Sequence, residues 1–184
     1  MKSINYLGII ILTLTLACED TNSNIDSKVE IGKIQDNVLI KKFDLPKLVT
    51  SSNPDSIDVD GDLKYDFTFT KTAVPLKTGY GLATQISKKS GTQIVLSVIN
   101  NYPDTLSYSA IIDDQANWSD DKNDKLVLQG YSCPQTQTYC VLAGNFIKSK
   151  EQYLGFKISK RYGWIKLVNE ESGALKIEEF AISK

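Results

Sequence analysis

Four aspartates in one short stretch of the chain have the spacing of a cation-binding loop. Asp58, Asp60, Asp62 and Asp66 follow the pattern D-x-D-x-D-x-x-x-D, with Gly61 in the turn. Calcium is a hard cation that takes six to eight oxygen ligands, and alternate carboxylates in a tight loop converge on one point. Neighbouring carboxylates also repel one another, and a bound cation relieves that repulsion. The spacing therefore predicts a structural calcium site made of these four side chains.

This stretch resembles the calcium loops of dockerins, thrombospondin type-3 repeats and related extracellular β proteins. Those loops usually have glycine at the sixth position, where this chain has Leu63, and Gly61 comes earlier in the turn. An EF-hand alignment that starts at Ser56 is rejected, because it places Phe67 where a glutamate is needed and lacks flanking helices. The alternative is a solvated Asp-Gly turn whose carboxylates accept hydrogen bonds from backbone N–H groups.

A second acidic stretch, residues 113–124, has no such ligand spacing. Its aspartates alternate with Lys122 and lie next to Lys125, so we expect a solvated loop there.

The composition excludes several kinds of catalytic site. The chain contains no histidine, so a Ser-His-Asp or Cys-His nucleophile, a histidine general base and the common histidine-containing zinc sites are excluded. A formal net charge of −1 provides no basic excess for binding nucleic acid. Some carboxylates remain as candidates for a glycosidase-like pair, but none lies in a recognisable motif, and we expect no enzymatic activity. These candidates are Glu151, Glu170, Glu171, Glu178 and Glu179.

The N-terminal residues predict export and lipidation. Lys2 precedes a short apolar run, and residues 1–17 have the pattern of a secretory signal peptide, too short to span a membrane. The end of this run resembles a bacterial lipoprotein lipobox, with Thr15 where that family prefers leucine. The resemblance implies a lipid on Cys18 that anchors the protein to a membrane. The polar residues 18–28 are predicted to form a disordered tether.

The residues next to Cys18 also bear on location and on the remaining cysteines. Glu19 and Asp20 resemble the surface-export signal of Bacteroidota lipoproteins, which implies the outer membrane or cell surface. An extracytoplasmic chain meets oxidising conditions, so Cys133 and Cys140 are expected to form a disulfide. Their spacing differs from the C-x-x-C pattern of redox-active pairs.

Short apolar or alternating runs, separated by turn residues, predict strands through the rest of the chain. Alternation with a period of two is clear in residues 153–158, and no stretch keeps a helical apolar stripe over three turns. Residues 29–184 are therefore predicted to form one antiparallel β-sandwich, either jelly-roll-like or immunoglobulin-like. The expected strands are 38–40, 65–70, 92–99, 106–112, 126–128, 140–143, 153–158, 163–168 and 174–182, with turn-rich breaks at 51–61, 88–91, 100–104 and 170–173.

The C-terminal third carries three motifs in succession: Tyr-Leu-Gly-Phe, Tyr-Gly-Trp-Ile and a final alternating strand. They resemble a recurring end of secreted bacterial β-domains, and with the Asp loop the resemblance spans roughly residues 55–182, its middle unmatched. It implies an extracytoplasmic, Bacteroidota-type lipoprotein with a β-sandwich domain, and no particular activity.

These observations lead to an expected function. We expect a non-catalytic binding or adhesion module that is anchored to the membrane and binds a glycan or a surface protein. Aromatic residues in or beside the expected loops could stack on sugar faces, although they are also ordinary hairpin residues. Two alternatives remain: a structural accessory subunit of an outer-membrane assembly, and a carboxylate-dependent glycan hydrolase. The aromatic residues are Tyr80, Tyr102, Trp118, Tyr131 and Tyr139.

Overall fold

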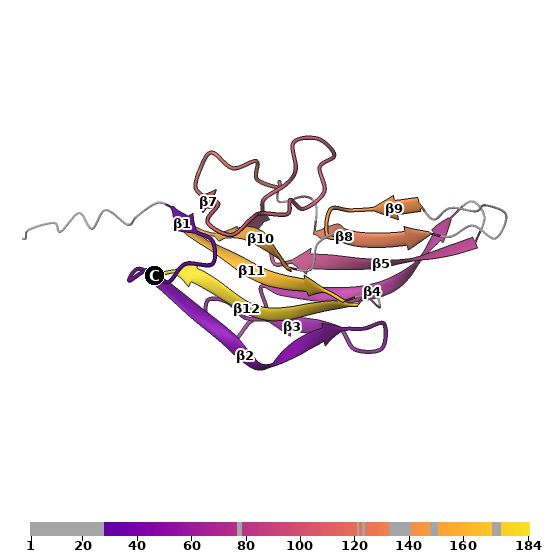
Figure 1. Cartoon of the computed structure of the whole chain (residues 1–184), viewed down its shortest axis with the longest axis horizontal. Helices are drawn as coiled ribbons and strands as arrows, with labels where there is room; N and C mark the ends of the chain where they lie inside the picture. Colours follow the sequence, from indigo (N-terminus) through magenta and orange to yellow (C-terminus); the bar gives the residue numbers. More distant parts are fainter. Residues whose placement is uncertain are drawn as a thin grey trace, which may run out of the picture.

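The computed structural model describes residues 28–76, 79–120, 122, 124–132, 141–147, 151–170 and 174–184. Every regular element in this part of the chain is a strand, and the strands form two five-stranded antiparallel sheets and a two-stranded one (Figure 1). One sheet, which we call the β11 sheet, has the order β2 (Val38–Val49), β12 (Leu175–Ser183), β11 (Arg161–Asn169), β10 (Glu151–Ile158) and β6 (Thr92–Ile94). The other, the β4 sheet, has the order β3 (Asp55–Ile57), β4 (Phe67–Leu76), β5 (Gly79–Lys88), β8 (Lys125–Ser132) and β9 (Val141–Ala143). The short strand β1 (Val29–Glu30) pairs with β7 (Ile111–Ile112).

The main hydrophobic core lies between the two large sheets. Alternate side chains of each strand point inward, as the period of two requires. Phe67 of β4 and Phe156 of β10 meet edge to face across this core, with ring centroids 5.1 Å apart. Gly163 lies opposite Phe156 on β11, where a Cβ atom would collide with the phenylalanine ring. The predicted antiparallel β-sandwich is confirmed.

A second hydrophobic cluster lies on the outer face of the β11 sheet. Residues 95–118 fold across this face, and buried Ile112 packs there with Trp164 of β11. The backbone is joined to β10 by a hydrogen bond from the N–H of Val95 to the carbonyl oxygen of Gly155, 3.0 Å long. A Cβ atom on Gly155 would lie only 2.8 Å from the Val95 side chain. The covering segment therefore packs directly against the strand backbone.

The covering segment also explains two errors in the predicted strands. The strand expected at 92–99 ends at Ile94, and the one expected at 106–112 consists of Ile111 and Ile112 only. Beyond Ile94 the chain leaves the sheet, and the N–H of Leu96 binds the carbonyl oxygen of Asn117 within the cover itself. One side of this segment is buried, and this produces apolar alternation in its sequence although the segment does not form a strand.

Three other strand predictions need correction. Strand β3 lies inside the predicted break 51–61, and β5 was missed because glycine and polar residues obscure its alternation. Strand β2 extends from 38 to 49, well beyond the expected 38–40. It is an edge strand, so many of its side chains are exposed and charged, and they give no apolar signal.

Several predictions concern residues outside the described part of the chain. These are the signal peptide (residues 1–17), the lipidated Cys18 with nearly all of the tether, and the disulfide between Cys133 and Cys140. They stay predictions. The described chain begins at Lys28, directly before β1.

Candidate functional site

The Asp loop, residues 58–66, connects β3 to β4. The N–H of Asp66 binds the carbonyl oxygen of Ile57 over 2.9 Å, which closes the loop at its base. Val59 is buried, and its N–H donates to Oδ2 of Asp66 over 2.9 Å. The Asp66 side chain has no exposed surface. One apolar and one acidic side chain therefore fix the base of the loop to the sandwich.

Asp58 holds the turn of the loop. Its Oδ1 accepts a hydrogen bond from the N–H of Gly61, 2.7 Å long, and its Oδ2 accepts one from the N–H of Leu63, 2.9 Å long. Gly61 and Leu63 both have left-handed backbone conformations, with φ of 79° and 66°. Leu63 thus adopts at the sixth loop position a conformation that glycine adopts more readily. The hydrogen bonds expected for an Asx-type turn are present.

Three of the four predicted ligands converge. One carboxylate oxygen from each of Asp58, Asp60 and Asp66 lies within 4.8 Å of the others, so this group could hold a metal ion. Asp62 is not part of this group. Its Oδ1 accepts a hydrogen bond from the N–H of Lys64, and its Oδ2 lies 3.0 Å from Nζ of Lys89.

Two basic side chains from elsewhere in the sequence neutralise part of the acidic loop. Nζ of Lys89, which follows β5, lies between Asp62 and Asp66, at 3.0 Å and 3.5 Å from their carboxylate oxygens. On the other side, Nη2 of Arg161 lies 3.3 Å from Oδ2 of Asp60. Arg161 belongs to the β11 sheet, so this ion pair links the loop of one sheet to the other sheet. The sequence spacing of the aspartates contained no sign of either partner.

The two carboxylates near Lys89 have opposite pKa shifts. Burial raises the pKa of Asp66, the repulsion from Asp60 adds to this, and the hydrogen bond from Val59 and the charge of Lys89 oppose it. The hydrogen bond from Lys89 lowers the pKa of the exposed Asp62, and the same bond raises the pKa of Lys89. A buried carboxylate in a group of three, with one nearby ammonium 3.5 Å away, is suited to a hard cation.

The second acidic stretch contains an ion pair that the sequence did not indicate. Oδ1 of Asp114 lies 2.7 Å from Nζ of Lys157 and accepts a hydrogen bond, 2.5 Å long, from the hydroxyl of Tyr162. The same ammonium lies 5.1 Å from the ring centroid of Tyr162 and 5.8 Å from that of Trp118. The prediction of a solvated loop is therefore incomplete, because Asp114 is exposed yet binds two side chains of the β11 sheet. This cluster fastens the covering segment to the outer face.

The charges of this cluster stabilise one another. Hydrogen bonds from Lys157 and then Tyr162 lower the pKa of Asp114. The hydrogen bond to Asp114 raises the pKa of Lys157, and burial raises the pKa of Tyr162. A lysine that is held in its charged form is a poor nucleophile or general base, so this cluster is a structural contact.

Most glutamates considered for a hydrolytic pair are bound to lysines. Glu151 and Glu178 both lie 3.1 Å from Nζ of Lys166. Burial of this lysine opposes its charged form, but the hydrogen bonds to the two glutamates outweigh burial and raise its pKa. Glu170 pairs with Lys176. Two further candidates differ: Glu179 borders a groove on the outer face, and Glu171 lies outside the described residues.

Comparison with known proteins gives no assignment. The chain matches no family model and has no significant match to a curated protein or a solved structure. In the described part of the chain, no helix has the length and apolar character needed to cross a membrane. A function must therefore be inferred from the residues themselves.

Proposed function

We propose that this protein is a non-catalytic binding or adhesion module of the bacterial cell envelope, anchored through Cys18, whose Asp loop is stabilised by calcium. The observation that carries the proposal is the convergence of Asp58, Asp60 and Asp66 within 4.8 Å. Carboxylates are the ligands that calcium prefers, and backbone carbonyls and water complete its coordination. The lipid anchor, the extracytoplasmic location and the glycan or protein ligand come from the sequence motifs.

A structural role for the ion follows from the position of the loop. Asp58 already orders the turn through two backbone N–H groups, and Asp66 is buried at its base. A cation between them offsets the cost of burying the Asp66 charge. Lys89 and Arg161 compensate part of the same charge, so we expect the ion to bind with modest affinity and to stabilise an already folded loop.

Binding rather than catalysis is supported by the state of the other carboxylates. Glycoside hydrolysis requires one carboxyl group to donate or accept a proton beside a second one. Glu151 and Glu178 share the ammonium of Lys166, which lies 3.1 Å from each and offsets part of their charge. No second function is favoured by a specific observation of comparable weight.

Thermal unfolding with and without calcium tests the ion site. At a calcium concentration about ten times the Kd, mass action stabilises a protein by about 1.4 kcal/mol, which raises the Tm of a chain of this size by about 3–6 °C. The Asp60→Asn variant should lose most of this rise. The Asp104→Asn variant removes a carboxylate outside the loop and should keep it. An unchanged Tm of the native protein at millimolar calcium contradicts the ion site.

A further inference from the structure

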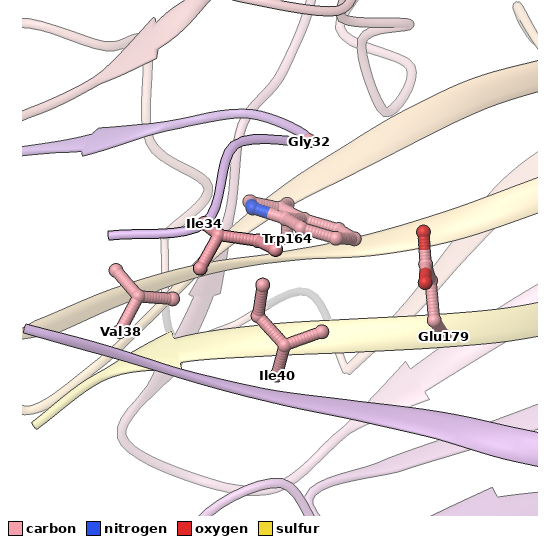
Figure 2. Close-up of a pocket in the computed structure, with 6 residues that line it drawn as sticks. All are labelled: Gly32, Ile34, Val38, Ile40, Trp164 and Glu179. Carbon is pink, nitrogen blue, oxygen red and sulfur yellow. The ribbon is translucent and has the colours of Figure 1, made fainter. Parts of the chain in front are cut away.

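A groove of about 420 Å³ lies on the outer face of the β11 sheet, between the residues Gly32 and Ile34 that follow β1 and the edge strand β2. Figure 2 shows the six residues that line the groove, with the Trp164 ring among them. The groove volume lies in the range of ordinary ligand-binding sites. The lining residues are Gly32, Ile34, Val38, Ile40, Trp164 and Glu179.

The groove is apolar along most of its length. Val38 and Trp164 are buried, and Ile40 packs against the same cluster. Ile34 is 91% exposed although it borders an apolar floor. Tyr108 of the covering segment packs directly on Gly32, where a Cβ atom would collide with the tyrosine ring, so the covering segment meets the groove at this glycine. Among the described residues, none covers the Ile34 side chain.

Exposed apolar side chains continue from the groove onto the covering segment. Tyr108, which packs on Gly32, is 61% exposed. Ile111 of β7 lies opposite Glu30 of β1 and is 58% exposed. A patch of exposed apolar side chains around a groove is typical of a protein-binding surface.

Glu179 brings a carboxylate to the groove. Its carboxylate is half-buried and makes no ion pair or hydrogen bond with any residue that the structure describes. Its two cross-strand neighbours are Lys166 on β11 and Lys42 on β2. Lys166 binds Glu151 and Glu178 instead, and Lys42 is exposed and unpaired with Glu179. Glu179 therefore has two lysines on neighbouring strands but forms a direct ion pair with neither of them.

We propose that this groove binds a segment of a partner protein that presents an aliphatic side chain next to a lysine or arginine. The aliphatic group packs on Ile34, Val38 and Ile40, and the basic side chain places its stem on the apolar floor and its charge at Glu179. The predicted tether before β1 has the wrong charge between residues 18 and 27, where it carries Glu19, Asp20 and Asp26 and no basic residue.

Partner binding at the groove rests on the proposed function as a binding module, for which the groove supplies a ligand surface. It does not require calcium.

The two tryptophans provide the readout. Trp164 lines the groove, whereas the Trp118 ring lies next to the ammonium of Lys157. Both indole N–H groups are buried without an acceptor among the described residues, and they give two separate indole signals in a ¹⁵N–¹H spectrum.

The test is a titration of the full-length ¹⁵N-labelled protein in EDTA with the peptide Ac-Gly-Leu-Lys-Gly-NH₂, up to about 10 mM. We expect a saturable shift of the Trp164 signal and a stationary Trp118 signal. The matched peptide Ac-Gly-Leu-Glu-Gly-NH₂ should bind about threefold to tenfold more weakly, as expected for loss of a partly exposed ion pair and for charge repulsion. The Glu179→Gln variant should bind both peptides equally, whereas Asp44→Asn, which removes a charge elsewhere on β2, should keep the preference.

A Trp164 signal that does not move saturably overturns the groove, and so does equal binding of the two peptides by the native protein. A preference that survives in Glu179→Gln also overturns it. Because EDTA removes calcium throughout, failure of the calcium site leaves these results unchanged. Failure of the groove likewise leaves the calcium response of Tm unchanged.

Discussion

Residues 58–66 and 113–120 are both rich in aspartate, but the hydrogen bonds that hold their carboxylates span very different lengths of chain. In the first segment, Asp58 binds backbone groups three and five residues away, and Asp66 binds one seven residues away. In the second, Asp114 binds side chains 43 and 48 residues away. The turn of the first segment is made by its own sequence and is then contacted by Lys89 and Arg161, whereas Asp114 of the second segment is held by tertiary contacts.

The difference in partners produces a difference in electrostatics. Asp66 is buried beneath its own loop, where removal from water is the largest influence on its pKa and raises it. Asp114 stays exposed, and its pKa is lowered because Lys157 and Tyr162 bind the charged form. For Asp66, burial outweighs the charge of Lys89 at 3.5 Å, so this carboxylate gains from an added cation, whereas the exposed Asp114 has Lys157 at 2.7 Å.

Replacing Asp66 should have the largest effect. Asp66→Ala leaves the buried N–H of Val59 without its acceptor, which we expect to lower the free energy of unfolding by about 2–3 kcal/mol. Urea denaturation in EDTA measures this loss. Asp66→Asn keeps an oxygen that can accept the same hydrogen bond, so its loss should be less than half as large. Equal losses for the two variants would show that Val59 does not depend on this acceptor.

A smaller effect distinguishes the two segments by the sign of their pH dependence. The folded chain holds the proton of Asp66 more tightly than the unfolded chain, so charged Asp66 destabilises the fold at neutral pH. This penalty disappears as the pH falls through the raised pKa of the folded state toward the ordinary value of 3.8. The native protein should therefore gain stability relative to Asp66→Asn on acidification.

Asp114 should show the opposite sign. Its stabilising contribution is complete above the ordinary pKa of 3.8 and is lost as the pH falls through the lower pKa of the folded state. The native protein should therefore lose stability relative to Asp114→Asn on acidification. Urea midpoints of the native protein and both variants, measured in EDTA from neutral pH to below the ordinary pKa, compare the two. Slopes of the same sign would show that both carboxylates have the same environment.

The smallest effect concerns the turn itself. Leu63→Gly relieves a left-handed conformation that costs a side chain about 1–2 kcal/mol, and it introduces a chain-entropy cost of about 0.5–1 kcal/mol. Leu63 is 94% exposed, so no packing is lost, and a net gain of about 0.5 kcal/mol is expected. Leu45→Gly, at another exposed leucine with ordinary φ, should instead lower the Tm. Loss of stability in both variants would mean that Leu63 is not strained.

Much of the fold could be predicted from the sequence because its signals are local. The alternation in β10 separates one face in the main core from one face under the covering segment, and the strand Glu151–Ile158 contains the predicted residues 153–158. The Asp loop is also local: spacing alone predicted that its four aspartates would converge, and all but Asp62 do so. The strands predicted within residues 95–118 were wrong, because burial on one side produces apolar alternation in an irregular covering segment as well as in a strand.

The sequence by itself determined which residues alternate, where the chain turns and which carboxylates lie in one loop, because these depend on neighbours a few residues apart. Only the tertiary structure decided that Lys89 and Arg161 compensate that loop, that Asp114 joins Lys157 and Tyr162, and that Glu179 forms no ion pair with a described residue. Such contacts depend on how distant strands are paired and stacked. Charge balance at a site is a sum over all nearby groups, and residues that are adjacent in the sequence are only some of these groups.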